Sequence, residues 1–225
     1  TSVLRFLKGA GPSAAAADVA GVAKAVAAEI LRLVELAADL GVYLVDNKPK
    51  NAVLFWSEQH VAVRFIDFDP AFCLVDAAPS RACALHVNTV SFLAGLLNDA
   101  CTLDATSGKF APRPGVLRER VFTVYEALAP NLASTDAAGL CAFLSTPPAA
   151  GEAAAGVVAR DYAARVVKQT ARYAQYAPSR HTYAQLVKHV TLGFQNLGDA
   201  PPSRPGTPPP TPRAPSATPE DPRGP

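Results

Sequence analysis

The chain is 225 residues long and 49% hydrophobic, which is enough to bury the core of one domain with appendages. Its 21 basic and 19 acidic residues give a net charge of +2 with no block of either sign, so charge favours neither a nucleic-acid nor a membrane partner. The four cysteines are scattered and form no Cys-x-x-Cys pair, which predicts buried thiols of a soluble intracellular protein rather than a zinc site. The sequence begins at Thr1 and contains no methionine, which indicates a fragment or a processed product.

The first third of the chain predicts a long helix followed by a short hairpin. After a lead over residues 1–12, apolar residues spaced three and four apart predict an amphipathic helix that ends at Gly41. Val42–Val45 is a brief apolar run. Two more apolar segments, Ala52–Phe55 and Val61–Ile66, flank a polar turn and predict two strands joined as a hairpin.

The middle and last parts of the chain predict helices and loops. The longest apolar stretch, Ala82–Cys101, contains His86, Asn88 and Asp99, so we expect a buried core helix near 84–100 rather than a membrane span. The expected architecture over residues 1–198 is therefore mainly α with a small β-hairpin, an α+β fold. The other expected segments are a loop carrying Gly108, Pro112 and Pro114, and helices near 115–129, 136–144, 153–176 and 183–197.

A proline-rich tail is expected over residues 199–225. Proline is the most frequent residue from Pro201 onward, and serine, threonine, alanine and glycine make up most of the rest. Such a segment buries too little apolar area to offset its ordering entropy, which predicts a disordered tail. Its Pro-x-x-Pro repeats leave open a proline-recognising domain as a partner.

Four polar residues around the predicted hairpin have a spacing that suits phosphoryl transfer. Asp46, Lys48 and Asn51 form the pattern Asp-x-Lys-Pro-x-Asn before the first strand, and Asp67 follows the second strand. Antiparallel pairing should bring Asn51 and Asp67 together at one end of the hairpin. Phosphoryl transfer needs metal ligands, a positive charge on the phosphates and a group that orients the attacking hydroxyl. Asp46 would orient the hydroxyl, Lys48 would reach the transferring phosphate, and Asn51 and Asp67 offer the oxygen ligands that Mg²⁺ prefers.

The pattern Asp-x-Lys-Pro-x-Asn, two strands and Ile-Asp-Phe together resemble the catalytic loop and the metal-binding Asp-Phe-Gly segment of the protein-kinase-like superfamily. The resemblance implies the large, mostly helical lobe of a divergent serine/threonine kinase that transfers the γ-phosphoryl group of ATP to a hydroxyl of a protein or a small molecule. It implies catalytic roles for Asp46 and Lys48, contact of Lys48, Asn51 and Asp67 with Mg²⁺ and ATP, and Asn51 and Asp67 as the metal ligands. The segment that starts at Asn88 looks like the Asp-Val-Trp-Ser-Leu helix start of that family.

The chain also departs from the family pattern. Leu44 and Val45 stand where His-Arg usually precedes the catalytic aspartate, and Asp69 stands where a glycine usually follows Asp-Phe. An acidic residue there is closer to small-molecule phosphotransferases such as the aminoglycoside and choline kinases. No glycine-rich phosphate loop and no strand lysine precede Ser13. Two alternatives therefore stay open, a catalytically impaired pseudokinase that serves as an interaction module and a small-molecule phosphotransferase.

Overall fold

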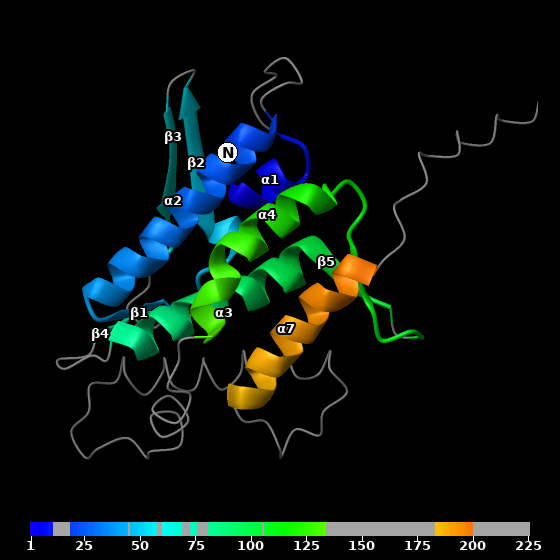
Figure 1. The fold of residues 1–225 in the computed structure, drawn as a ribbon. Coiled ribbons are helices and arrows are strands. Elements are labelled where there is room, and N and C mark those ends of the chain that lie inside the picture. The colour runs from blue at the N-terminus through cyan, green and yellow to red at the C-terminus, as the bar shows by residue number, and fades with distance from the viewer. Residues whose placement is uncertain are drawn as a thin grey trace, which may run out of the picture.

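Helix α3 (Arg81–Ala100) is the centre of the fold, and three other helices pack against it (Figure 1). These helices are α2 (Val19–Asp39), α4 (Arg118–Leu128) and α7 (Tyr183–Asp199). Apolar residues occupy most positions around α3, so the helix is buried along most of its length, as expected for a core helix. The computed structural model describes residues 1–10, 19–44, 46–57, 60–68, 73–75, 81–104, 106–133 and 183–199.

Helix α2 buries one face against the rest of the core. Val26, Ile30 and Val34 recur every four residues and are fully buried. Gly41 follows the end of the helix with a φ of 68°, a left-handed conformation that glycine adopts without steric cost and that commonly ends helices. The predicted end of this helix is therefore confirmed. Its predicted beginning lies before Val19 and outside the described residues.

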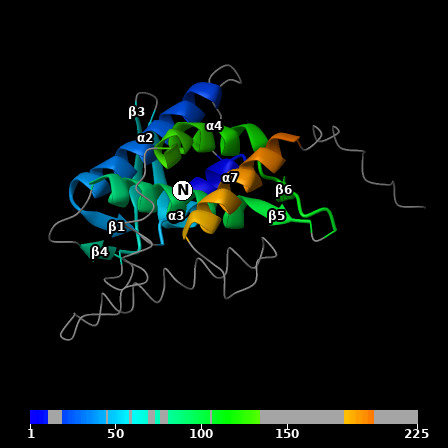
Figure 2. The ribbon, with the colours of Figure 1, turned by 60° about the horizontal axis from the view of Figure 1, so that its bottom comes forward.

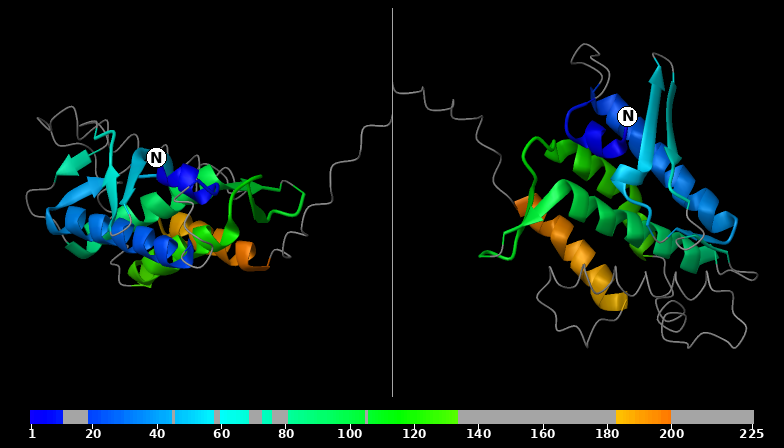
Figure 3. Two further views of the ribbon diagram at one scale, coloured as in Figure 1. Left: turned by 90° about the horizontal axis from the view of Figure 1, so that it is seen from above. Right: turned by 180° about the vertical axis from the view of Figure 1, so that it is seen from behind.

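The predicted hairpin is present and packs on α2 (Figures 1 and 3). Strand β2 (Ala52–Ser57) pairs antiparallel with β3 (His60–Phe65), and Ala52 stands opposite Phe65. Leu54 and Val63 also stand opposite each other, and both are buried. One face of the hairpin therefore lies on the core, as the alternation of side chains along a strand allows.

Both edges of this hairpin are occupied. Along the free edge of β2, the Thr1 carbonyl accepts a hydrogen bond from the Leu54 N–H at 2.6 Å, and Ser2 forms an antiparallel bridge with Val53. Along the free edge of β3, the Val63 N–H donates to Oε2 of Glu29, a residue of α2, at 3.4 Å. The hairpin is thus held by the start of the chain on one side and by α2 on the other.

Two further sheets, each of two short strands, lie at opposite ends of α3 (Figure 2). Strand β1 (Val42–Leu44) pairs with β4 (Cys73–Val75) near the start of α3, and β5 (Cys101–Leu103) pairs with β6 (Phe110–Pro112) after its end. Pro112 therefore belongs to a strand, so its assignment to a loop was wrong. Strands of three residues are too short to show the alternation on which strand prediction rests.

The lead contains a helix that the sequence did not predict, α1 (Val3–Leu7), whose Ser2 hydroxyl caps the Arg5 N–H. Arg120 of α4 fastens this helix to the core. Its Nη1 donates to the carbonyls of Phe6 at 2.5 Å and Ala10 at 3.2 Å. The guanidinium also lies over the Phe6 ring, 4.3 Å from its centroid.

The remaining expectations for the fold divide into confirmed and untested ones. Helices α4 and α7 confirm the helices expected near 115–129 and 183–197, and a 3₁₀-helix over Ala129–Ala133 extends α4. In the portion of the chain that the structure describes, no helix combines the length and the hydropathy needed to cross a bilayer. Mixed helices and small antiparallel sheets confirm the α+β class, whereas the likeness to a kinase lobe stays a prediction. The expected helices near 136–144 and 153–176 and the proline-rich tail beyond residue 199 lie outside the described residues.

Candidate functional site

The loop that carries Asp46, Lys48 and Asn51 connects β1 to β2 and runs beside α3. It ends in a 3₁₀-helix over Pro49–Asn51, where the fixed φ of Pro49 suits the first helical position. The Asn51 N–H donates to the Lys48 carbonyl at 2.8 Å and closes this turn. The turn therefore places Asn51 immediately before Ala52, the first residue of β2.

Hydrogen bonds from two neighbours orient the Asp46 carboxylate. Lys48 Nζ donates to both carboxylate oxygens, at 2.5 and 2.6 Å. Asn51 Nδ2 donates to the Asp46 carbonyl and to its Oδ2, both at 3.2 Å. The side chains of Asp46 and Lys48 are mostly buried, so water screens this ion pair less than it would screen one on the surface. The three residues of the sequence pattern thus form one connected group.

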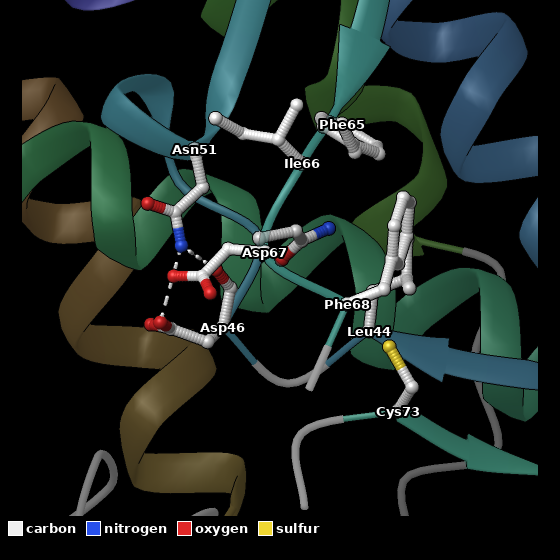
Figure 4. A pocket seen from close by; sticks show the side chains of 9 residues that line it. Leu44, Asp46, Asn51, Phe65, Ile66, Asp67, Phe68 and Cys73 are labelled. Atoms are coloured by element: carbon white, nitrogen blue, oxygen red, sulfur yellow. Dashed lines mark hydrogen bonds between the residues drawn. The ribbon is translucent and has the colours of Figure 1, made fainter. Parts of the chain in front are cut away.

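Asp67 reaches this group through the register of the hairpin. Since Ala52 stands opposite Phe65, and the Ile66 N–H donates to the Asn51 carbonyl at 2.8 Å, the chain leaves β3 beside Asn51. Figure 4 shows the side chains of Asp46, Asn51 and Asp67 directed into the same region. The expectation that Asn51 and Asp67 meet at one end of the hairpin is therefore confirmed.

The backbone of Asp67 is strained. Its φ of 69° is in the left-handed region, and among the described residues other than glycine it is alone in having a positive φ. Such a conformation costs of order 1 kcal/mol or more and persists only where the surroundings impose it. Strained residues concentrate at functional sites, so this backbone marks Asp67 independently of the sequence pattern.

A pocket lies where these side chains meet (Figure 4). Asp46 and Asp67 supply its acidic groups and Asn51 one of its amide groups, and most of the remaining wall is apolar. Cys73 of β4 belongs to this wall and is half-buried, which corrects the expectation of a buried thiol at that position. The other lining residues are Leu44, Asn47, Phe65, Ile66 and Phe68.

The chemistry of the donors fits magnesium better than a transition metal. Among the described residues, no three acidic, histidine or cysteine side chains gather as a metal cage. Mg²⁺ needs no such cage, because it keeps several waters and binds through one or two protein oxygens together with substrate phosphates. The hydrogen bonds of the Asn51 side chain use Nδ2, which leaves Oδ1 as an oxygen ligand without a hydrogen bond among the described residues. Asn51 and Asp67 could therefore hold Mg²⁺ at this pocket.

Two asparagines that the sequence analysis did not place at the site tie the loop to α3. Asn88 is fully buried, accepts from the Leu44 N–H at 2.6 Å and donates to the Val42 carbonyl at 2.9 Å. Its own carbonyl accepts from Asn47 Nδ2 at 2.9 Å. Asn88 lies well inside α3, which begins at Arg81, and not at the start of the helix. The signal for its role was a buried amide in an apolar stretch, which needs partners.

Asn47 has a buried side-chain oxygen. Only 5% of the Asn47 surface is exposed, and its Oδ1 has no hydrogen-bond partner within the described part of the chain. A buried carbonyl without a donor is costly, and the pocket that Asn47 helps to line is the place from which a donor can come.

Comparisons of the chain with protein-family models, with curated proteins and with solved structures gave no match. The chemistry of the site therefore rests on its own residues, and the kinase-like interpretation rests on the spacing of Asp46, Lys48, Asn51 and Asp67.

Proposed function

We propose that this chain is the large lobe of a divergent serine/threonine kinase-like phosphotransferase, which binds Mg²⁺ and ATP and transfers the γ-phosphoryl group to a hydroxyl. One observation carries the proposal. Asp46 and Asn51 from the loop before β2, and the strained Asp67 after β3, line one pocket. The register of the hairpin brings Asn51 beside the exit of β3, but it does not require the left-handed backbone of Asp67 or the hydrogen bonds that hold Asp46 there.

Each residue has a part that its surroundings suit. Asp46, held by Lys48 and Asn51, can accept a hydrogen bond from the attacking hydroxyl and orient it. Lys48 can turn its ammonium from Asp46 to the terminal phosphate, because both groups are anionic acceptors within reach of one flexible side chain. Asn51 Oδ1 and the Asp67 carboxylate would hold Mg²⁺. When bound, Mg²⁺ and ATP supply the phosphoryl group and neutralise its charge.

The first test is metal-dependent nucleotide binding, measured by calorimetry with ATP in the presence of Mg²⁺ or of EDTA. We expect binding that requires Mg²⁺ and that weakens at least roughly tenfold in Asp67→Ala, since a metal ligand is lost. Asp104→Ala is the matched control, because Asp104 is an exposed carboxylate in a distant turn. It should bind as the wild type does.

The second test is transfer of labelled γ-phosphate to serine and threonine peptides, and to aminoglycosides and choline as small-molecule acceptors. Transfer to peptides supports the protein-kinase form of the proposal, and transfer to the small alcohols supports the alternative phosphotransferase. Wild-type protein that binds no nucleotide in the first test contradicts the proposal. It would leave the interaction module as the better interpretation.

A further inference from the structure

One face of α3 contacts the loop over Asp46–Asn51 at its beginning, its middle and its end. The contacts come from Asn88, Gly95 and Asp99, and residues separated by seven and by four positions lie on the same side of an α-helix. Asn88 holds the beginning of the loop, as described above. The other two contacts meet the residues that flank Pro49, where the chemistry of the proposed site is concentrated.

Gly95 determines how closely Lys48 approaches the helix. A Cβ atom at Gly95 would lie 2.5 Å from the Lys48 Cβ and 3.1 Å from its Cα. The first separation is shorter than carbon atoms tolerate, and the second involves backbone, so no change of side-chain rotamer relieves the clash. With any other residue at position 95, the loop would have to move away from α3 at Lys48.

Asp99 lies one helical turn beyond Gly95 and holds the end of the loop. Its Oδ2 accepts the backbone N–H of Lys50 at 3.4 Å, which is a long hydrogen bond. Lys50 is the middle residue of the 3₁₀-helix that ends at Asn51. Asp99 thus acts on the backbone turn that presents Asn51 to the pocket.

We propose that Gly95 and Asp99 are positioning residues, which fix Lys48 and Asn51 relative to Asp46 and so determine the charge offered to the terminal phosphate. The catalytic part of this inference rests on the proposed function. The contact itself does not, and the two can be tested separately.

The contact is tested by a double-mutant cycle in thermal unfolding. Gly95→Ala should lower the unfolding midpoint in the wild type, and by roughly half as much in a Lys48→Gly background, which removes the closest atom. Gly193→Ala on α7 is the matched control, because its new Cβ would meet the side chains of Leu97 and Phe110 and not the loop. Its effect should be equal in both backgrounds. Equal losses from Gly95→Ala in the two backgrounds would overturn the inference.

A second measurement keeps the inference falsifiable if Lys48→Gly does not fold. Hydrogen exchange at the Lys50 amide should quicken roughly tenfold in Asp99→Ala and stay slow in Asp99→Asn, which keeps an acceptor oxygen. Exchange that is the same in the wild type and in both variants contradicts the role of Asp99.

The positioning role is tested by the ratio of ATP affinity to ADP affinity in the presence of Mg²⁺. A change that only loosens the fold lowers the affinities for ATP and ADP alike. Displacement of Lys48 instead lowers the affinity for ATP, because ATP carries the terminal phosphate that Lys48 would contact. We expect the ratio to fall roughly tenfold in Gly95→Ala and to stay unchanged in Gly193→Ala. An unchanged ratio in Gly95→Ala overturns the positioning role. Absence of nucleotide binding by the wild type instead sinks the proposed function, and the cycle with Lys48→Gly still decides whether the contact exists.

Discussion

His86 lies in the second turn of the core helix α3, with 3% of its surface exposed. Burial disfavours the charged form and lowers its pKa from 6.5 to about 4. Burial also lowers the pKa of His189 on α7. Both residues are therefore neutral in the folded protein at neutral pH.

This burial makes stability depend on pH. The unfolded chain binds a proton at His86 below about pH 6.5, whereas the folded chain does so only near pH 4. The contribution of the neutral His86 to the free energy of unfolding is complete above pH 6.5. It is lost as the pH falls from 6.5 to 4, and the loss is roughly 3 kcal/mol. Urea unfolding of the wild type and of His86→Leu at pH 7 and pH 4.5 checks the prediction. The variant should lose less stability between the two pH values, and an equal loss would contradict it.

At the scale of single residues, the sequence predicted which residues of the candidate site lie together better than it predicted the residues that hold them in place. Asp46, Lys48, Asn51 and Asp67 could be found because their spacing within a short segment carries the information. Asn88 holds that segment from 44 positions beyond Leu44, and no local pattern announces such a partner. The contact of Gly95 with Lys48 is equally invisible, because a helical glycine gives no signal of what lies opposite.

At the scale of elements, the tie between α3 and β1 depends on the Asn88 side chain. We predict that Asn88→Ala destabilises the fold by about 3 kcal/mol, because it leaves the buried Leu44 N–H and the half-buried Val42 carbonyl without their partner. The stability of Asn88→Asp should lie between those of the wild type and Asn88→Ala. The aspartate keeps an acceptor for the Leu44 N–H and loses the donor to the Val42 carbonyl. Chemical denaturation measures all three. Asn98→Ala, at a half-buried position of the same helix, is the control and should cost less than about 1 kcal/mol.

The elements differ in how well the sequence predicted them, and length explains the difference. Helices α2, α3 and α7 and the β2–β3 hairpin span enough residues for a period to show, and each was expected close to where it lies. Helix α1 has five residues, and the strands of the other two sheets have three each, so none of them spans enough periods. These short elements form because the core offers them partners, which is tertiary information.

At the scale of the whole molecule, Arg120 joins the first helix to the helical core. We predict that Arg120→Met destabilises the protein by about 3 kcal/mol, since the Phe6 carbonyl loses a charged donor inside the core. Burial already lowers the pKa of Arg120, so its guanidinium depends on these carbonyl partners. Thermal unfolding and hydrogen exchange at the amides of α1 measure the effect. Arg113→Met, which removes an exposed guanidinium bound to the Asn98 carbonyl, should change stability by less than about 1 kcal/mol.

The two occupied edges of the β2–β3 hairpin affect how copies of this chain behave toward one another. An open strand edge presents unpaired N–H and carbonyl groups that recruit a strand from a neighbouring molecule, which begins aggregation. Thr1 and Ser2 use groups along one edge, and the Glu29 carboxylate engages an N–H of the other and places a negative charge there. The Arg32 side chain lowers the pKa of Glu29 by a hydrogen bond, so this charge persists into mildly acidic solution. The same contacts that fix the hairpin in the fold therefore disfavour growth of its sheet from one molecule into the next.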